Sequence, residues 1–310
     1  MERLGPNGKR RGEVERLFQE RRRGSVLRRL WASRKPLSFR AFVILMRMTG
    51  TFARGQRALL APEVSEHVFF MPDLPVELDG LRILHLSDLH LDFVPGLAEV
   101  LSAHLADLSY DLTVFTGDFV DRMSPETLGI LESGMDRILA QLKGPRYGVL
   151  GNHDLLCVAK TLEARGLPIL LNESVAVPFR GAVLGLVGVD DPHLFEGHDL
   201  LRAGARVPDG VFRLLLAHSP VIAQEAAAAG FSVCLCGHTH GGQVCLPGLP
   251  RPNGGRGIPP ERVSGYWRFG SMQGYTSRGV GASGLPVRFR APPEIVIHTL
   301  RAAENSLPFA

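Results

Sequence analysis

The sequence has few cysteines, and their placement excludes two common classes of protein. Only four of the 310 residues are cysteine, namely Cys157, Cys234, Cys236 and Cys245. Their spacing matches neither a zinc ribbon nor the disulfide framework of a small secreted protein. We therefore expect free thiols in a reducing compartment. The sequence also has no internal repeat and no glycine-rich phosphate loop of the NTPase kind.

Long apolar runs are missing as well. The longest uninterrupted apolar stretch near the N-terminus is residues 41–46, far short of the about 20 residues that a membrane-spanning helix needs. The 40 residues before it are charged or mixed, which is unlike a secretory signal peptide. We therefore expect a cytoplasmic protein, placed at most peripherally on the inner face of the membrane.

Positive charge is concentrated at the N-terminus. Residues 1–40 contain 13 Lys and Arg against 4 Glu, whereas the whole chain has a formal net charge of only +4. Within residues 14–31, apolar residues and arginines are interleaved as in a basic amphipathic helix on an anionic membrane surface, although Gly24 interrupts the pattern. A disordered solubilising tail and a nucleic-acid-binding arm are the alternatives.

The remaining residues suffice for one folded domain. The chain is 45% hydrophobic, so residues 61–310 can bury a single substantial core. We accordingly divide the chain into a basic, partly amphipathic arm, residues 1–60, and an α/β domain, residues 61–310.

Five polar clusters each follow a strand-like apolar run. They are Asp88-Leu89-His90, Gly117-Asp118, Gly151-Asn152-His153-Asp154, His218 and Gly237-His238-Thr239-His240. The preceding runs are rich in Leu, Val, Ile and Phe, as buried strands are. Because ligands in open α/β folds collect where strands end, we expect the clusters to converge at one sheet edge.

The side chains of these clusters suit a pair of metal ions. Carboxylates, imidazoles and one amide form a mixed oxygen and nitrogen set that favours Mn, Fe or Zn over a thiolate or an all-oxygen site. Asp118 is the natural bridge, since one carboxylate can bind two cations. Two cations about 3.5 to 4 Å apart clamp the attacking and leaving oxygens of a displacement at phosphorus. A single Asp-x-His or Gly-Asp can also arise from turn formation, so only the full set is specific.

The order of the clusters, D-x-H, G-D-x-x-D, G-N-H-D, H and G-H-x-H, resembles the calcineurin-like metallophosphoesterases over roughly residues 80–300. The amino-acid sequences at residues 87–90, 237–243 and 277–281 are similar to those of a bacterial, often membrane-associated branch of this family. That branch includes enzymes that cleave the pyrophosphate of UDP-2,3-diacylglucosamine. The resemblance implies two packed mixed β-sheets flanked by helices, a four-layer α/β/β/α sandwich.

The resemblance also implies a role for each residue. Asp88, His90 and His240 would hold one metal, Asn152, His218 and His238 the other, and Asp118 would bridge them. His153 matches the family's catalytic histidine, which contacts the phosphoryl group and protonates the leaving oxygen, while a hydroxide bridging the metals is the nucleophile. We expect Asp154 to orient His153. Asp121 is expected behind the ligands or at a helix start.

Residues outside the clusters supply further candidates. The guanidinium of Arg278 matches phosphate oxygens, although an ordinary surface arginine is the alternative. His193 follows another apolar run and is a candidate for substrate contact. Residues 247–274, rich in Gly and Pro, are expected to form an irregular loop facing substrate or membrane. For the other histidines outside the clusters, His67, His85, His104, His198 and His298, we expect structural or surface roles.

Together these features predict a metal-dependent hydrolase of phosphoric esters or pyrophosphates. Two divalent ions are expected, with Mn²⁺ preferred and Fe or Zn as alternatives. The expected substrate is a phosphorylated small molecule or lipid, in particular a lipid-linked or nucleotide-lipid phosphodiester or pyrophosphate. A nuclease or cyclic-nucleotide phosphodiesterase is the alternative, and a non-enzymatic scaffold is weaker because His153 and the ligand set are intact. Removing residues 1–36 is expected to spare hydrolysis of a small soluble diester.

Overall fold

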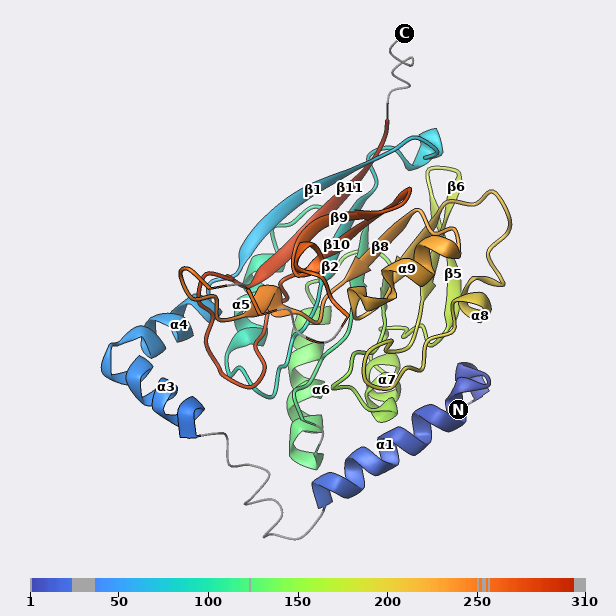
Figure 1. Cartoon of the computed structure of the whole chain (residues 1–310). Helices are drawn as coiled ribbons and strands as arrows, with labels where there is room; N and C mark the ends of the chain where they lie inside the picture. The colour runs from blue at the N-terminus through green and yellow to red at the C-terminus, as the bar shows by residue number, and fades with distance from the viewer. Residues whose placement is uncertain are drawn as a thin grey trace.

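Two mixed β-sheets form the centre of the molecule (Figure 1). The computed structural model describes residues 2–303 apart from residues 24–36, 123, 250, 253–254 and 256. The first sheet has the order β1-β11-β2-β3-β4, that is Glu63–Met71, Glu294–Ala302, Arg82–Leu86, Leu112–Phe115 and Arg146–Gly148. Neighbouring strands are parallel except for the antiparallel pair β11 and β2.

The second sheet has six strands in the order β5-β6-β7-β8-β10-β9. These are Glu173–Phe179, Ala182–Gly188, Arg213–Leu216, Val233–Cys236, Met272–Thr276 and Gly265–Phe269. The four inner strands are parallel, and the two edge strands β5 and β9 are antiparallel to their neighbours.

Helices cover the outer faces of both sheets, which confirms the predicted α/β/β/α order of layers. On the outer face of the first sheet lie α5, α6 and α7, which are Leu97–Leu105, Pro125–Leu139 and Leu156–Glu163; on the second lie α8 and α9, Leu200–Gly204 and Ala223–Ala228. Alternation along β2 explains this arrangement, because Ile83 faces the other sheet whereas Leu84 and Leu86 face the helices. Short 3-10 helices occur at Glu2–Leu4, Val76–Leu78, Pro220–Ile222, His240–Gly242 and Pro260–Arg262.

Among the described residues before the first strand, α-helices occur at α1 (Asn7–Arg23), α3 (Leu37–Met48) and α4 (Thr51–Leu59). The chain from residue 2 into α1 lies next to α7 (Figure 1). Leu4 is buried in the same hydrophobic core as the inner side of α7. Arg3 donates to Glu163 of α7 and to Glu173 of β5. The first part of the predicted arm therefore contacts the body, while residues 24–31 of the predicted amphipathic helix lie outside the described residues.

Residues 247–274 are more regular than the sequence suggests. Within them, β9 pairs with β10 as an antiparallel hairpin, and Trp267 is buried with its indole N–H donating to Thr276 Oγ1 at 2.9 Å. The prediction of one irregular loop was wrong from residue 265 on, because the density of Gly and Pro hid the alternation of exposed Tyr266, buried Trp267 and exposed Arg268; the described residues before it have only the 3-10 helix Pro260–Arg262.

Candidate metal centre

The predicted clusters follow five strands and meet at one edge of the two sheets. In the first sheet, Asp88 and His90 follow β2, and Asp118 follows β3. The segment with Asn152 and His153 follows β4. From the second sheet, β7 leads into His218, and β8 leads into His238 and His240. Each set of strands is parallel, so their carboxyl ends coincide, and stacking of the two sheets brings both sets of ends together.

The backbone at the ligands is unusual. Five of the seven predicted ligands have positive φ: Asp88 52°, His90 42°, Asp118 55°, His238 75° and His240 53°. A non-glycine residue in this region costs on the order of 1 to 3 kcal/mol and persists only where its surroundings hold it. The sequence does not reveal this strain, which is concentrated at the strand ends that present the ligands.

Glycines let the strained loops approach one another. Gly117 has φ 93°, and a side chain there would overlap the backbone of Gly151. A side chain at Gly151 would in turn overlap Asp118. The glycines of the Gly117-Asp118 and Gly151-Asn152 clusters are therefore needed for close packing of the loops after β3 and β4.

Asp154 binds those loops together instead of contacting the His153 side chain. Its carboxylate accepts from the backbone N–H groups of Asp118 at 2.8 Å, Phe119 at 3.0 Å and Gly151 at 2.9 Å. His153 Nδ1 instead lies 2.8 Å from the Asp121 carbonyl oxygen. The predicted contact between Asp154 and His153 is therefore corrected: the chain turns after Gly151, and this turn directs the Asp154 carboxylate back toward the backbone.

The ligands form two groups that share Asp118. In one group, His90 Nε2 lies 3.2 Å from His240 Nε2, and His240 Nε2 lies 3.4 Å from Asp88 Oδ1. In the other, His218 Nε2 lies 3.2 Å from Asp118 Oδ2 and 3.3 Å from His238 Nδ1. Asp118 Oδ2 also lies 3.6 Å from His90 Nε2, so this carboxylate stands between the groups.

The spacing of these atoms fits bound cations. Asn152 Oδ1 completes the second group, 2.7 Å from His238 Nδ1 and 2.9 Å from His218 Nε2. Ligand atoms that bind one ion at the usual distances lie about 3 Å from one another. His218 Nδ1 donates to the Thr116 carbonyl at 2.7 Å, which leaves the lone pair of Nε2 directed toward the other ligands.

Comparison with known proteins agrees with this geometry. The model of the family "Calcineurin-like phosphoesterase" matches residues 81–242. The chain belongs to this family. It is 32% identical to the uncharacterized metallophosphoesterase YkuE of Bacillus subtilis, over 77% of this chain and 86% of that protein. It is 30% identical to the phosphodiesterase YaeI of Escherichia coli (70% and 80%) and 28% identical to a zebrafish transmembrane protein with a metallophosphoesterase domain (86% and 64%).

Membership of the calcineurin-like phosphoesterases confirms two predictions made from the motifs. The chain is a hydrolase that acts on phosphoesters, and the family implies divalent metal, typically two ions. Groups of His and Asp able to hold an ion occur where those predictions placed them: Asp88, His90 and His240, and Asp118, His218 and His238. A further group contains His90, Asp121 and His153, but Asp121 Oδ1 already accepts from Ser283 Oγ at 2.7 Å.

The charge distribution of this phosphoesterase favours a cation between the ligands. Burial lowers the pKa of His218, but Asp118, Asp88 and Asp191 outweigh burial and raise the pKa to about 10. At the other group, burial and then Arg288 hold the pKa of His240 well below its usual value, so this ring stays neutral. Since a divalent ion supplies the positive charge that His218 otherwise takes up as a proton, metal binding should release a proton.

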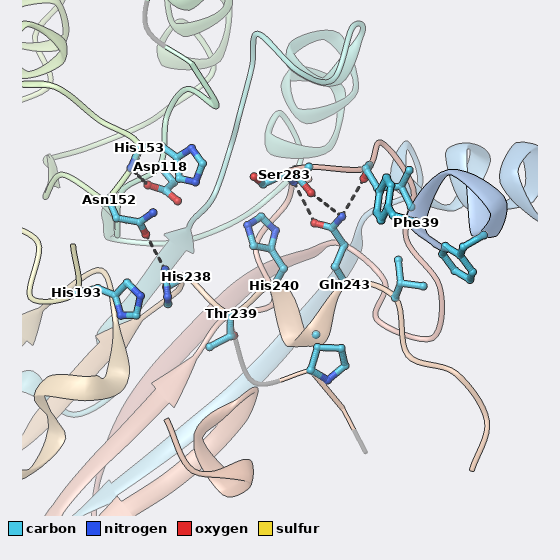
Figure 2. A pocket seen from close by; sticks show the side chains of 16 residues that line it. Phe39, Asp118, Asn152, His153, His193, His238, Thr239, His240, Gln243 and Ser283 are labelled. Carbon is cyan, nitrogen blue, oxygen red and sulfur yellow. Dashed lines mark hydrogen bonds between the residues drawn. The ribbon is translucent and has the colours of Figure 1, made fainter. Parts of the chain in front are cut away.

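A cleft of about 550 Å³ opens over the two groups of ligands. His193 lines this cleft beside His238, with 4.2 Å between ring centroids, so the structure brings His193 to the site (Figure 2). Phe39 and Phe42 of α3 also line the cleft, and Figure 2 shows Phe39 next to Gln243.

Arg278, the other predicted substrate residue, is directed elsewhere. Its Nη2 lies 3.1 Å from Glu63 and 3.1 Å from Glu294, and it is absent from the residues that line the cleft. The structure does not bring its guanidinium to the ligands, because β1 and β11 place two carboxylates next to it.

Two buried arginines near the site were missed. Arg288 donates to the His240 carbonyl at 2.7 Å and to the Gly281 carbonyl at 2.6 Å. Arg11 of α1 donates to the Asp154 carbonyl at 2.6 Å, directly after His153. Both side chains are almost fully buried. No local pattern distinguishes them from the other arginines of the sequence, since only the folded chain shows what surrounds them.

Proposed function

We propose that the chain hydrolyses a phosphodiester or pyrophosphate bond with two metal ions, and that its substrate is lipid-linked or a nucleotide lipid. The observation that carries the two-metal proposal is the position of Asp118, whose Oδ2 lies 3.2 Å from His218 of one group and 3.6 Å from His90 of the other. Two ions held there would polarise the phosphoryl oxygens and lower the pKa of bound water. The mixed imidazole and carboxylate set favours Mn²⁺, with Fe or Zn as alternatives.

His153 is suited to protonate the leaving oxygen. Donation from Nδ1 to the Asp121 carbonyl, at 2.8 Å, orients the ring and leaves Nε2 to hold the proton. Burial lowers the pKa of His153, but Asp118 and Asp121 outweigh burial, so the pKa is raised overall. Ions bound at Asp118 would weaken its effect on this pKa, so the orientation of the ring by the Asp121 carbonyl is the main support for His153 as proton donor.

Two observations support the finer substrate class. The rings of Phe39 and Phe42 line the same cleft as the metal ligands, and so offer apolar surface beside the reacting phosphate. The relative from Escherichia coli is named a phosphodiesterase, which supports a diester substrate over a monoester.

The test is a panel of substrates supplied with Mn²⁺. It compares a nitrophenyl monoester, a bis-nitrophenyl diester, UDP-2,3-diacylglucosamine and single-stranded DNA, for the wild type and for Asp118→Asn. Asp118→Asn should lower the bound metal below about two ions per chain and the diester rate at least about 10³-fold, since it removes the charge shared by both ions. Asp107→Asn, at an exposed aspartate, is the matched control and should change neither.

His153→Asn separates catalysis from metal binding. It should keep about two ions and lower the rate about 10²- to 10⁴-fold. Full activity of Asp118→Asn, or uptake of only one ion by the wild type, would contradict the two-metal site. Hydrolysis of DNA in preference to the lipid-linked pyrophosphate would contradict the lipid proposal and indicate a nuclease.

A further inference from the structure

Helix α3 has apolar residues on two opposite faces. One face, with Phe39, Phe42, Val43 and Met46, is turned toward the protein; Phe39 and Phe42 line the metal cleft and Met46 is 6% exposed. The other face consists of Leu37, Ala41, Ile44, Leu45 and Met48, a spacing of i, i+4, i+7, i+8 and i+11 that forms one continuous stripe. All five residues of this outer stripe are exposed, Leu37 at 80% and Met48 at 81%.

An exposed apolar stripe of this kind is costly in water. Scattered single apolar residues are normal on a surface, but four large ones in register on one short helix indicate a binding surface. The inner face of α3 already packs against the protein. The apolar residues of the outer stripe are therefore not needed to cover the core.

The charges around the stripe indicate what covers it. Arg40 and Arg47, seven residues apart, flank one edge of the stripe, and Arg54 and Arg57 of α4 are also exposed. The sequence has no Asp or Glu from residue 37 to residue 62. Aliphatic side chains bordered by arginines, in a stretch of sequence without acidic residues, match an anionic lipid surface, where the aliphatic chains enter the boundary region and the guanidinium groups meet phosphates. With 12 residues, α3 would be about 18 Å long, so it can lie along a bilayer but not cross it.

The same helices are attached to the metal centre. The backbone N–H of Arg288 donates to the Gly55 carbonyl of α4 at 3.1 Å, and the Arg288 guanidinium donates to the His240 carbonyl at 2.7 Å. In Figure 2 Phe39 lies at the side of the cleft next to Gln243, whose amide donates to Ser283 and Leu285. A surface bound to the stripe would therefore lie at a fixed position relative to the cleft.

We propose that the outer stripe of α3 docks the enzyme on an anionic bilayer, a proposal that rests on the hydrolase function proposed above. Docking in this way would orient the entrance of the metal cleft toward phosphates at the lipid surface. Docking is thus assigned to α3 with the arginines beside it. The sequence had instead placed the amphipathic helix at residues 14–31, before α3.

The test measures vesicle binding and hydrolysis on the same Mn²⁺-loaded full-length protein. Sedimentation with vesicles of phosphatidylcholine containing about 30 mol% phosphatidylglycerol is compared for the wild type and for the double variant Ile44→Gln/Leu45→Gln. The variant should bind the vesicles at least about tenfold more weakly, since it removes two large apolar side chains from the membrane contact. Leu201→Gln is the matched control at a leucine that is 84% exposed on α8, and should bind as the wild type does.

The charge requirement is tested by Arg40→Gln/Arg47→Gln. On the anionic vesicles this pair should weaken binding roughly tenfold, and on phosphatidylcholine alone it should make no difference. Hydrolysis of the soluble diester should be unchanged in all three variants. Wild-type vesicle binding by Ile44→Gln/Leu45→Gln, or an equal loss in Leu201→Gln, would overturn the proposal.

A second copy of the chain is the competing occupant. If the wild type sediments as a dimer and Ile44→Gln/Leu45→Gln as a monomer, with equal vesicle binding, the stripe is a subunit interface and the membrane proposal fails. Failure of the wild type to hydrolyse any phosphoester would instead contradict the proposed function. The vesicle-binding results would then still decide whether the stripe docks on a membrane.

Discussion

Helices α1 and α3 both precede the first strand, yet they contact the rest of the molecule in opposite ways. α1 is rich in arginine, and its Arg11 is fully buried against Asp190 and the face of Phe195. α3 is mostly apolar, and its stripe of Leu37, Ile44, Leu45 and Met48 faces solvent. Polarity alone would place these helices the other way round, so composition is a poor guide to which part of an N-terminal segment is bound to the body.

Two contacts of α1 reach the turn that contains His153. Arg11 Nη2 donates to the carbonyl of Asp154, and Glu15 accepts from the backbone N–H of Leu156, where α7 begins. Both contacts brace the turn that contains His153. α1 therefore acts as a support for the site, whereas α3 borders the entrance of the cleft.

Of the changes to these two helices, removal of α1 should have the largest effect. Deletion of residues 1–23 should lower kcat for a soluble diester about 100-fold, because the turn holding His153 loses its support and misplacement by about 1 Å has effects of that size. This outcome is the opposite of the prediction from sequence that removing residues 1–36 spares hydrolysis of a soluble diester. The measurement is steady-state kinetics with the metal content determined on the same sample, which should stay at about two ions per chain. Unchanged kcat would show that α1 contributes no support.

A smaller and more specific effect is expected from Arg11→Met. This change leaves the Asp190 carboxylate buried without its cation, so the free energy of unfolding should fall by about 3 to 5 kcal/mol. Arg10→Met is the matched control, since Arg10 pairs with Glu196 at the surface, and it should cost about 0 to 1 kcal/mol. Denaturant unfolding measures both, and equal losses would contradict the contrast.

The effect of Arg11→Met should also depend on pH. Burial raises the pKa of Asp190 to about 6, although Arg11 opposes the rise. A folded-state pKa above the unfolded value means that stability is lost as pH increases through that range. Without Arg11 the pKa rises further, so the variant should lose additional stability relative to the wild type above about pH 6. Asp190→Asn in the same background should remove this pH dependence.

The smallest effect on stability is expected from the stripe of α3. Ile44→Gln/Leu45→Gln should change the free energy of unfolding by less than about 0.5 kcal/mol per site, because both side chains are already exposed in the folded state. A loss of several kcal/mol would show that these side chains pack against the protein, and would remove the contrast with α1.

The convergence of the candidate metal ligands could be predicted from the sequence. Asp88, Asp118, Asn152 and His238 sit just after apolar runs, and such runs become parallel strands whose ends coincide. The pattern could not show that Asp154 holds the backbone of two loops while the Asp121 carbonyl orients His153. Neighbours in sequence are not neighbours in contact once a chain turns, so such assignments need the folded backbone.

By itself the sequence determined which residues can bind metal, since ligand chemistry belongs to each side chain and strand ends are marked by local apolar patterns. Only the tertiary structure decided that Arg11 is buried beside the catalytic turn, that Arg278 faces two glutamates, and that the apolar stripe of α3 is exposed. The physical reason is the distance along the chain between interacting residues. Hydrophobic periodicity involves a few neighbouring residues, whereas burial and ion pairing can depend on segments more than 100 residues away, as for Arg11 with Asp190 and Arg278 with Glu63.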